Sequence, residues 1–292
     1  MTRPEELPVL ERLRHDLPQL SGSEARVARH LMANYPLAGL KTVAEFAEGS
    51  GVSTATVLRL VKRLGFPVYA DFQEALRRHL EETLQSPLIR FGQRQDQDKA
   101  ASPKASFLNR FLDAMSAHLE AMHEHVPASE FDKVVALLCD PKRDIHVLGG
   151  RYSSHLGAYF ADMICAVRGR IHMVSGQTQR WPQHLLDIGK NSVLVAFDVR
   201  RYQQDVIEFA RAAARRGATV VLMTDIWQSP AARVATYVLG FPVVAPSIFD
   251  VLGPGMILTD ALIGAVADQM GETGKARVEL LEELRQPFAP PK

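Results

Sequence analysis

One short segment carries an acid, two arginines and a tyrosine where a predicted strand gives way to a helix. It reads FDVRRYQQD, residues 197–205, and follows the apolar run NSVLVA. Asp198 can serve as an acid or base, accept a hydrogen bond from a ligand hydroxyl, or pair with an arginine. Arg200 and Arg201 carry guanidinium groups that suit a phosphate or a carboxylate. The residue types leave three interpretations open: a catalytic cluster, an anion clamp, or a solvated loop.

Another candidate loop follows the first predicted strand of the same half of the chain, in VLGGRYSSHLG, residues 147–157. In chain order it is the first loop, and the segment 197–205 is the second loop. Its glycines let the backbone approach a ligand, and its arginine can add a bidentate contact. Its serines begin a predicted helix, whose N-terminal N–H groups suit phosphate. The alternative is a tight turn without a ligand, and the absence of GxGxxG argues against a nucleotide site. The candidate residues are Gly149, Gly150, Arg151, Ser153 and Ser154.

The spacing of acids and histidines indicates no catalytic or metal site. General acid–base catalysis requires an acid and a base within hydrogen-bond reach of the substrate. The residues of suitable chemistry are His155, His184, Asp198 and Asp225. They form no recognisable constellation, and the sequence has neither a nucleophile elbow nor a P-loop. The remaining histidines lack the i, i+4 spacing of metal ligands. The sequence therefore predicts no enzyme, no catalytic residue, no metal and no cofactor.

The most specific pattern in the chain lies in its N-terminal third. VAEFAEGSGVSTATVLRLVKRLG, residues 43–65, predicts two short helices joined by a tight turn. Gly51 supplies the positive φ of the turn, and Ala47 is small where the helices approach each other. Val57 and Leu60 would hold the second helix against the first, as in a helix-turn-helix. The alternative is a packed helical hairpin whose charged face is only solvated.

The second helix of this motif would lie in the major groove of DNA, with its N-terminal residues against base edges. Its first turn carries short hydroxyls, cations follow, and no acid occurs between Gly49 and Ala70. This local positive charge suits a polyanion. Arg59 is the expected base-reading residue, whereas Lys62 and Arg63 are expected to contact phosphates. The candidate DNA-binding residues are Ser53, Thr54, Thr56, Arg59, Lys62 and Arg63.

Helical signals surround this motif over residues 1 to about 80. Ser21 and Glu24 fit a capping box, and Thr42 and Glu45 fit a second one. Ser53 would begin the next helix, and Gly65 is placed to end it. The sequence therefore predicts an all-α helix-turn-helix domain over residues 1–84.

Strand and helix patterns alternate in the second half of the chain. Apolar runs that read as strands occupy residues 144–150, 170–174, 191–197, 218–224 and 236–241. Helical segments separate most of them, near 153–167, 202–216 and 254–270. Continuous apolar strands divided by helices are typical of a parallel sheet covered on both faces. The predicted fold is therefore an α/β doubly wound domain with a mainly five-stranded parallel sheet, over residues 106–286.

The remaining segments are predicted to be connecting or terminal. Residues 85–105 mix proline, glutamine, charge and small residues, which indicates an interdomain linker. Residues 287–292 are a short tail. The apolar helix within 247–270 is expected to pack in the core and in a subunit interface, because palindromic operators require a two-fold protein.

The net charge, the length of the apolar runs and the cysteines indicate what class of protein this is. The formal net charge of the 292 residues is +1, so DNA binding requires a local basic patch. No run reaches the roughly 20 apolar residues of a membrane span, and the N-terminus does not resemble a signal peptide. Cys139 and Cys165 lie in apolar surroundings and are expected to be buried free thiols. These features predict a cytoplasmic protein without a membrane partner.

A family resemblance covers essentially the whole chain. SGSEARVARHLMANYP, TVAEFAEGSGVSTATVLRLVKRLGF and YADFQEALRRHL resemble the N-terminal domain of RpiR (MurR/RpiR) bacterial transcription regulators. That family joins this domain to a sugar isomerase (SIS) domain, which the second half fits in length, order and strand pattern. The resemblance implies a homodimer or homotetramer on operator DNA, controlled by a phosphosugar or a related anionic metabolite such as a sugar acid.

The resemblance also assigns the two loops as ligand loops, with one departure. SIS domains commonly carry Ser-x-Ser-Gly-x-Thr at the second loop, whereas this chain has Phe197-Asp198-Val199-Arg200-Arg201-Tyr202. The hydroxyl-lined phosphate cradle is missing, although the arginines can engage an anion directly. Two alternatives stay open. In one the SIS-like domain only dimerises, and in the other the protein is a phosphosugar isomerase with an appended helical domain.

Overall fold

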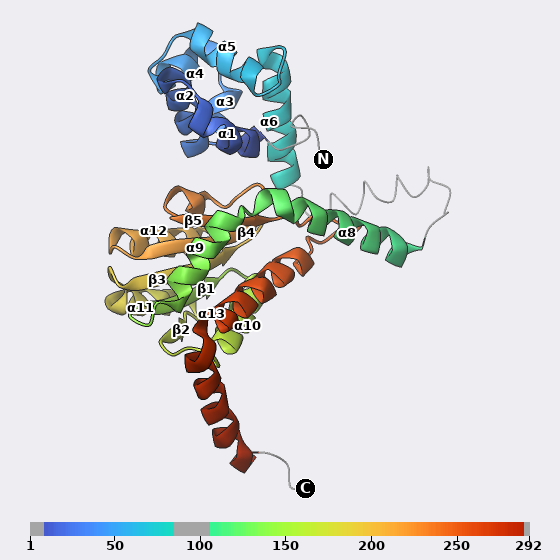
Figure 1. The fold of residues 1–292 in the computed structure, drawn as a ribbon. Helices are drawn as coiled ribbons and strands as arrows, with labels where there is room; N and C mark the ends of the chain where they lie inside the picture. The colour runs from blue at the N-terminus through green and yellow to red at the C-terminus, as the bar shows by residue number, and fades with distance from the viewer. Residues whose placement is uncertain (1–8, 85–105, 289–292) are drawn as a thin grey trace. The chain divides into compact units, whose positions relative to one another are not determined.

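The chain divides into two compact units, residues 1–92 and 93–292. The computed structural model describes residues 9–84 and 106–288 (Figure 1). The predicted linker, residues 85–105, lies outside the described residues, as do residues 1–8 and 289–292.

The N-terminal unit is helical throughout its described part. Its helices are α1 (Val9–Asp16), α2 (Gly22–Ala33), α3 (Leu37–Leu40), α4 (Val43–Ser50), α5 (Thr54–Arg63) and α6 (Tyr69–Leu84), with a 3-10 turn at Leu17–Gln19. Both predicted capping boxes form: Ser21 and Glu24 begin α2, and Thr42 and Glu45 begin α4. Each box satisfies backbone N–H groups that a helix start leaves unpaired.

Two left-handed glycines set the ends of α4 and α5, as predicted. Gly51 follows α4 with φ 64°, and Gly65 lies just beyond α5 with φ 88°. A side chain would be strained at either position. The helices close around a core that includes Phe46, Leu60 and Phe72, each at most 1% exposed. Helices α4 and α5 therefore form the predicted helix-turn-helix, with α2 packed against both.

The second unit is an α/β domain with a parallel five-stranded sheet, which confirms the predicted fold class. The strands are β1 (Asp144–Gly149), β2 (Ile171–Met173), β3 (Ser192–Asp198), β4 (Thr219–Asp225) and β5 (Tyr237–Phe241). They are ordered β2-β1-β3-β4-β5, and every neighbouring pair is parallel. The direction of winding reverses between β1 and β3, which is where open α/β sheets commonly bind ligands.

Helices cover both faces of this sheet (Figure 1). Helices α9 (Ala128–Cys139), α10 (Ser154–Ile164) and α13 (Gly253–Arg285) lie on one face, and α11 (Trp181–His184) and α12 (Gln204–Arg215) on the other. Alternate residues of β3 serve the two cores: Val193, Val195 and Phe197 face α10 and α13, whereas Leu194 and Ala196 face α12. Because both faces are covered, β3 is buried along its whole length.

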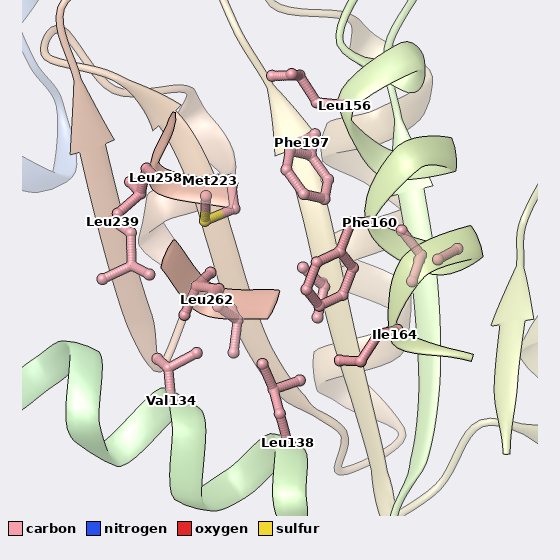
Figure 2. Packing of buried hydrophobic residues seen from close by; sticks show 14 of the residues in the cluster. Val134, Leu138, Leu156, Phe160, Ile164, Phe197, Met223, Leu239, Leu258 and Leu262 are labelled. Atoms are coloured by element: carbon pink, nitrogen blue, oxygen red, sulfur yellow. The ribbon is translucent and has the colours of Figure 1, made fainter. Parts of the chain in front are cut away.

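The first of these cores is shown in Figure 2. Phe160 of α10 and Phe197 of β3 pack with their ring centroids 6.0 Å apart, and Leu262 of α13 belongs to the same cluster. Helix α8 (Phe107–His125) contacts β5 and α13 from outside the sheet. This packing fixes the carboxyl ends of β1 and β3, from which both candidate loops emerge.

Two expectations about this unit require correction. Cys139 is half-buried, whereas Cys165 is exposed, because Cys165 lies at the C-cap of α10 rather than on its core face. Both are free thiols, as predicted. Helix α13 also continues to Arg285, well past the predicted end near residue 270. Gly271 (φ 50°, ψ −132°) breaks its regular geometry, and the turns beyond carry mostly exposed residues, so core periodicity could not predict them.

Candidate functional site

Helix α5 presents one exposed, positively charged face. Ser53, Thr54, Arg59, Lys62 and Arg63 are all exposed. The opposite face is buried against the rest of the unit, through residues that include Val57 and Leu60. The helical period therefore separates the core-packing residues from five of the six candidate DNA-binding residues.

Thr56 is the exception. It is only 8% exposed, and its hydroxyl lies 3.1 Å from that of Ser53. Ser53 is the N-cap of α5 and accepts a hydrogen bond from the Thr56 N–H. The structure thus places Thr56 in the cap of the helix rather than on its outer face.

Arg59 is held by an acid from another helix. Its Nε lies 3.0 Å from Glu24 Oε1 of α2, while 59% of the Arg59 side chain stays exposed. Glu24 is buried, and the hydrogen bond from the Ser21 hydroxyl is the largest cause that lowers the pKa of its carboxyl, with Arg59 a smaller one. The guanidinium is therefore anchored on one side and open to solvent on the other, which restricts its orientation before any partner binds.

Two further residues share the exposed face and were missed by sequence reasoning. Ala55 is exposed, and Leu58 is 42% exposed although it is large and apolar. Their positions relative to Arg59 and Lys62 on the helical period were the available signal. A small apolar side chain on such a face can contact a thymine methyl group.

The two candidate loops of the α/β unit emerge side by side. Gly149 at the end of β1 is paired with Phe197 near the end of β3. A Cβ at Gly149 would lie 2.4 Å from the Ser154 Cα, so glycine is required there by the tight turn itself. The N–H of Gly150 donates to the Phe197 carbonyl at 3.1 Å and to the buried Ser153 hydroxyl at 3.0 Å.

Ser153 is part of the same internal joint. It is 3% exposed, and its hydroxyl donates to the Phe197 carbonyl at 2.6 Å. Arg151 is exposed, and Ser154 is half-buried with its hydroxyl 3.3 Å from the Arg151 carbonyl oxygen. Of the five candidates in this loop, Arg151 and Ser154 are those with side chains that solvent can reach.

Asp198 and Asp225 end β3 and β4 and are both fully buried. Asp198 accepts hydrogen bonds from the Ser229 hydroxyl and from the Gln203 N–H, and burial raises the pKa of its carboxyl to about 7. Asp225 accepts from the Tyr202 hydroxyl at 2.8 Å and from backbone N–H groups, and burial raises its pKa as well. Both carboxyls are thus used inside the protein.

Arg200 is also internal. Only 1% of its side chain is exposed, and its guanidinium is paired with Asp250 from the segment that precedes α13. The guanidinium carbon lies 4.1 Å from the centroid of the Trp227 ring, and the Arg200 N–H donates to Asp225 at 2.7 Å. In this structure Arg200 joins three segments of the domain and does not face solvent.

Arg201 behaves differently from its neighbour. It is exposed, and within the described part of the chain neither Arg201 nor Arg151 forms an ion pair. The structure therefore brings two open guanidinium groups to the ends of the adjacent strands β3 and β1. The partners of Arg200 and Asp198, namely Asp250, Trp227 and Ser229, are far away in sequence, and no motif indicated them.

Gln203 is the residue that connects the two loops. Its side-chain oxygen accepts a hydrogen bond from the Arg151 N–H. No sequence pattern indicated it, because a glutamine at a helix start carries no specific signal.

Within residues 9–84 and 106–288, no group of three or more acids, histidines or cysteines is arranged to hold a metal ion, and no helix is long and apolar enough to cross a membrane.

Comparison with known proteins gives a match for each unit. Residues 7–83 match the model of the helix-turn-helix domain of the rpiR family, and residues 137–265 match that of the SIS domain. The chain is 22% identical over 224 residues to a helix-turn-helix-type transcriptional regulator of Providencia stuartii, covering 75% of each protein.

Two solved structures share the fold. The Vibrio vulnificus NanR protein complexed with ManNAc-6P has a TM-score of 0.56 and 19% identity, over 97% of this chain and 100% of that one. The sugar isomerase domain of an RpiR transcription factor from Sphaerobacter thermophilus has a TM-score of 0.54 and 18% identity, over 60% of this chain and 97% of that one.

Proposed function

The chain belongs to the RpiR family of transcription regulators, which join a helix-turn-helix domain to a SIS domain, and we propose that a small anionic metabolite controls its binding to operator DNA. Residues 1–84 would bind DNA, and residues 106–286 would bind the metabolite and form a homodimer or homotetramer in the cytoplasm. The metabolite would be a phosphosugar or a sugar acid, consistent with the ManNAc-6P held by the NanR protein.

The exposed face of α5 is the observation that supports the proposed DNA binding. A recognition helix lies in the major groove with its N-terminal residues toward the base edges, and a cationic face is attracted to the phosphate backbone. We propose Arg59 for base readout, because Glu24 orients its guanidinium while leaving it open. Ser53, Thr54, Lys62 and Arg63 would contact phosphates or sugars, and Ala55 and Leu58 would lie against base edges.

The observation that supports anion sensing is the pair of open guanidinium groups at the ends of β1 and β3. Arg151 and Arg201 would bind the anion, with Ser154 and the Gly149–Gly150 turn beside it. Arg200, Asp198 and Ser153 would support the site from within, since their side chains are buried in internal hydrogen bonds. The carboxyls of Asp198 and Asp225 are likewise used in internal hydrogen bonds, which favours ligand sensing over catalytic turnover.

A second candidate function rests on those same internal contacts. If the residues of the second loop served only to stabilise the fold, the α/β unit would only hold subunits together. The two candidates are separated by thermal-shift measurements of the full chain with a panel of phosphosugars and sugar acids, because a ligand that binds only the folded state raises the melting temperature. A rise with anionic members supports sensing, and no response across the panel favours assembly alone.

The DNA-binding proposal is tested by genome-wide mapping of bound DNA. We expect discrete operator sites with two-fold symmetry, and the neighbouring genes would narrow the class of effector. Uniform occupancy without sequence preference would contradict the proposal. Assay of the purified protein for aldose–ketose interconversion tests the enzyme alternative, and robust turnover would overturn a purely regulatory role.

A further inference from the structure

Gln203 lies in the second candidate loop, and its side chain reaches the first. We propose that it is a specificity-determining residue, because its side-chain oxygen occupies the Arg151 N–H that an oxygen of the anionic effector would take. Effector binding would then require the glutamine side chain to leave. This inference rests on the proposed anion-sensing function, and it explains how Gln203 would exclude weakly binding ligands from the site.

The backbone of Gln203 is anchored while its side chain spans the loops. Gln203 is the N-cap residue of α12, and its N–H donates to the buried Asp198 carboxylate at 3.2 Å. Its side chain reaches back to the first loop and lies against Gly150, where an added Cβ would come within 2.7 Å of its oxygen. The glycine thus permits the close approach that the carboxamide makes.

The Arg151 N–H differs from the other donors of the first loop. The Gly150 N–H is taken by the Phe197 carbonyl and the buried Ser153 hydroxyl, and the Ser154 N–H donates to the Gly150 carbonyl at 2.8 Å. Those acceptors are backbone atoms or a buried side chain and cannot leave without disrupting the turn. The acceptor of the Arg151 N–H is the end of a half-buried side chain, which can rotate away.

Charge determines which ligands can displace the carboxamide. Its oxygen is neutral, so it gains little from the exposed guanidinium groups of Arg151 and Arg201. A phosphate or carboxylate oxygen would gain charge-assisted hydrogen bonds from the same groups. A neutral sugar would exchange one neutral acceptor for another. Gln203 would therefore select anionic effectors against neutral sugars that bear the same hydroxyls.

Calorimetric titration of the 292-residue chain tests this inference, with inorganic phosphate and N-acetylmannosamine 6-phosphate as probes. Gln203→Ala removes the competing acceptor, and we expect about fivefold tighter binding of both probes, as for loss of one neutral hydrogen bond. Gln203→Glu places a carboxylate among the arginines, and we expect at least about tenfold weaker binding. Melting curves without probe verify that both variants fold.

The outcomes separate this inference from the proposed function. If the wild type binds a probe, Arg151→Ala/Arg201→Ala does not, and Gln203→Ala binds equally or more weakly, then Gln203 only holds the loops together and the inference is overturned. If neither probe binds to any variant, both the inference and the proposed site for these anions are overturned. Opposite shifts in Gln203→Ala and Gln203→Glu support the inference, because a structural role would weaken binding in both.

Discussion

The exposed face of α5 and the carboxyl ends of β1 and β3 use similar residue types in opposite ways. On α5, five of the six predicted DNA-binding residues are exposed. At the strand ends, Asp198 and Arg200 are buried and hold the fold together, whereas Arg201 is open. On a helix, the exposure of a polar residue follows from the helical period, whereas in a loop it depends on partners that are distant in the sequence.

The sharpest contrast is between the adjacent residues Arg200 and Arg201. Arg200→Ala would leave Asp250 without its guanidinium and remove the group packed on Trp227. We expect a loss of about 3–5 kcal/mol in the free energy of unfolding, measured with urea, as for breaking a buried ion pair. Arg201→Ala is the matched control and should change it by less than about 0.5 kcal/mol. Equal effects would show that the two arginines are not divided into internal and open roles.

On the DNA-binding side, Arg59→Ala should reduce the preference for operator over random DNA by roughly 1–3 kcal/mol if Arg59 reads a base. Fluorescence anisotropy with both DNAs measures it. Lys62→Ala is the control, and we expect it to weaken binding to both DNAs alike and to lower the salt dependence. An unchanged operator preference in Arg59→Ala would refute the assignment.

The buried carboxyl of Asp198 predicts that the stability of the protein depends on pH. Its pKa in the folded protein, about 7, lies above the ordinary aspartate value of 3.8, so the folded state binds the proton more tightly. Stability is then greatest at low pH and falls as the pH rises through 7. Because of this carboxyl, the free energy of unfolding should fall by about 2 kcal/mol between pH 5 and pH 7. Asp198→Asn should reduce the slope in urea titrations, while Asp225, whose pKa burial also raises, keeps a contribution of its own. A slope equal to the wild type would place the titration elsewhere.

The smallest expected effect concerns the cap of α5. Ser53→Ala removes the acceptor of the Thr56 N–H and should destabilise the helical unit by about 1 kcal/mol. Thr54→Ala, at an exposed position of the same turn, should cost less than about 0.5 kcal/mol. Thermal unfolding compares the two, and equal losses would mean that the Ser53 cap contributes little.

The helices, strands and turns of both regions were predictable from the sequence because each depends on local residues. Capping boxes at Ser21 and Thr42, the positive φ of Gly51 and the strand–helix alternation all depend on residues close together in the chain. The burial of Thr56 could have been predicted from the same helical period that placed Val57 and Leu60 in the core.

The internal role of the second loop could not be predicted in that way. Arg200 meets Asp250 across 50 residues of sequence, and Asp198 meets Ser229 across 31. Each pairing exists only once β3, β4 and the segment before α13 are assembled. The same holds for Gln203, whose importance depends on the position of the first loop rather than on its own residue type.

Effector sensing is tested most directly by measuring operator binding by the full chain while anionic sugar derivatives are titrated in. The wild type should change its operator affinity at least about fivefold with an effective anion, as is typical of allosteric coupling. Arg151→Ala/Arg201→Ala should retain operator affinity without anion and lose the response. A response that survives in this variant would show that the open arginines at the ends of β1 and β3 do not sense the effector.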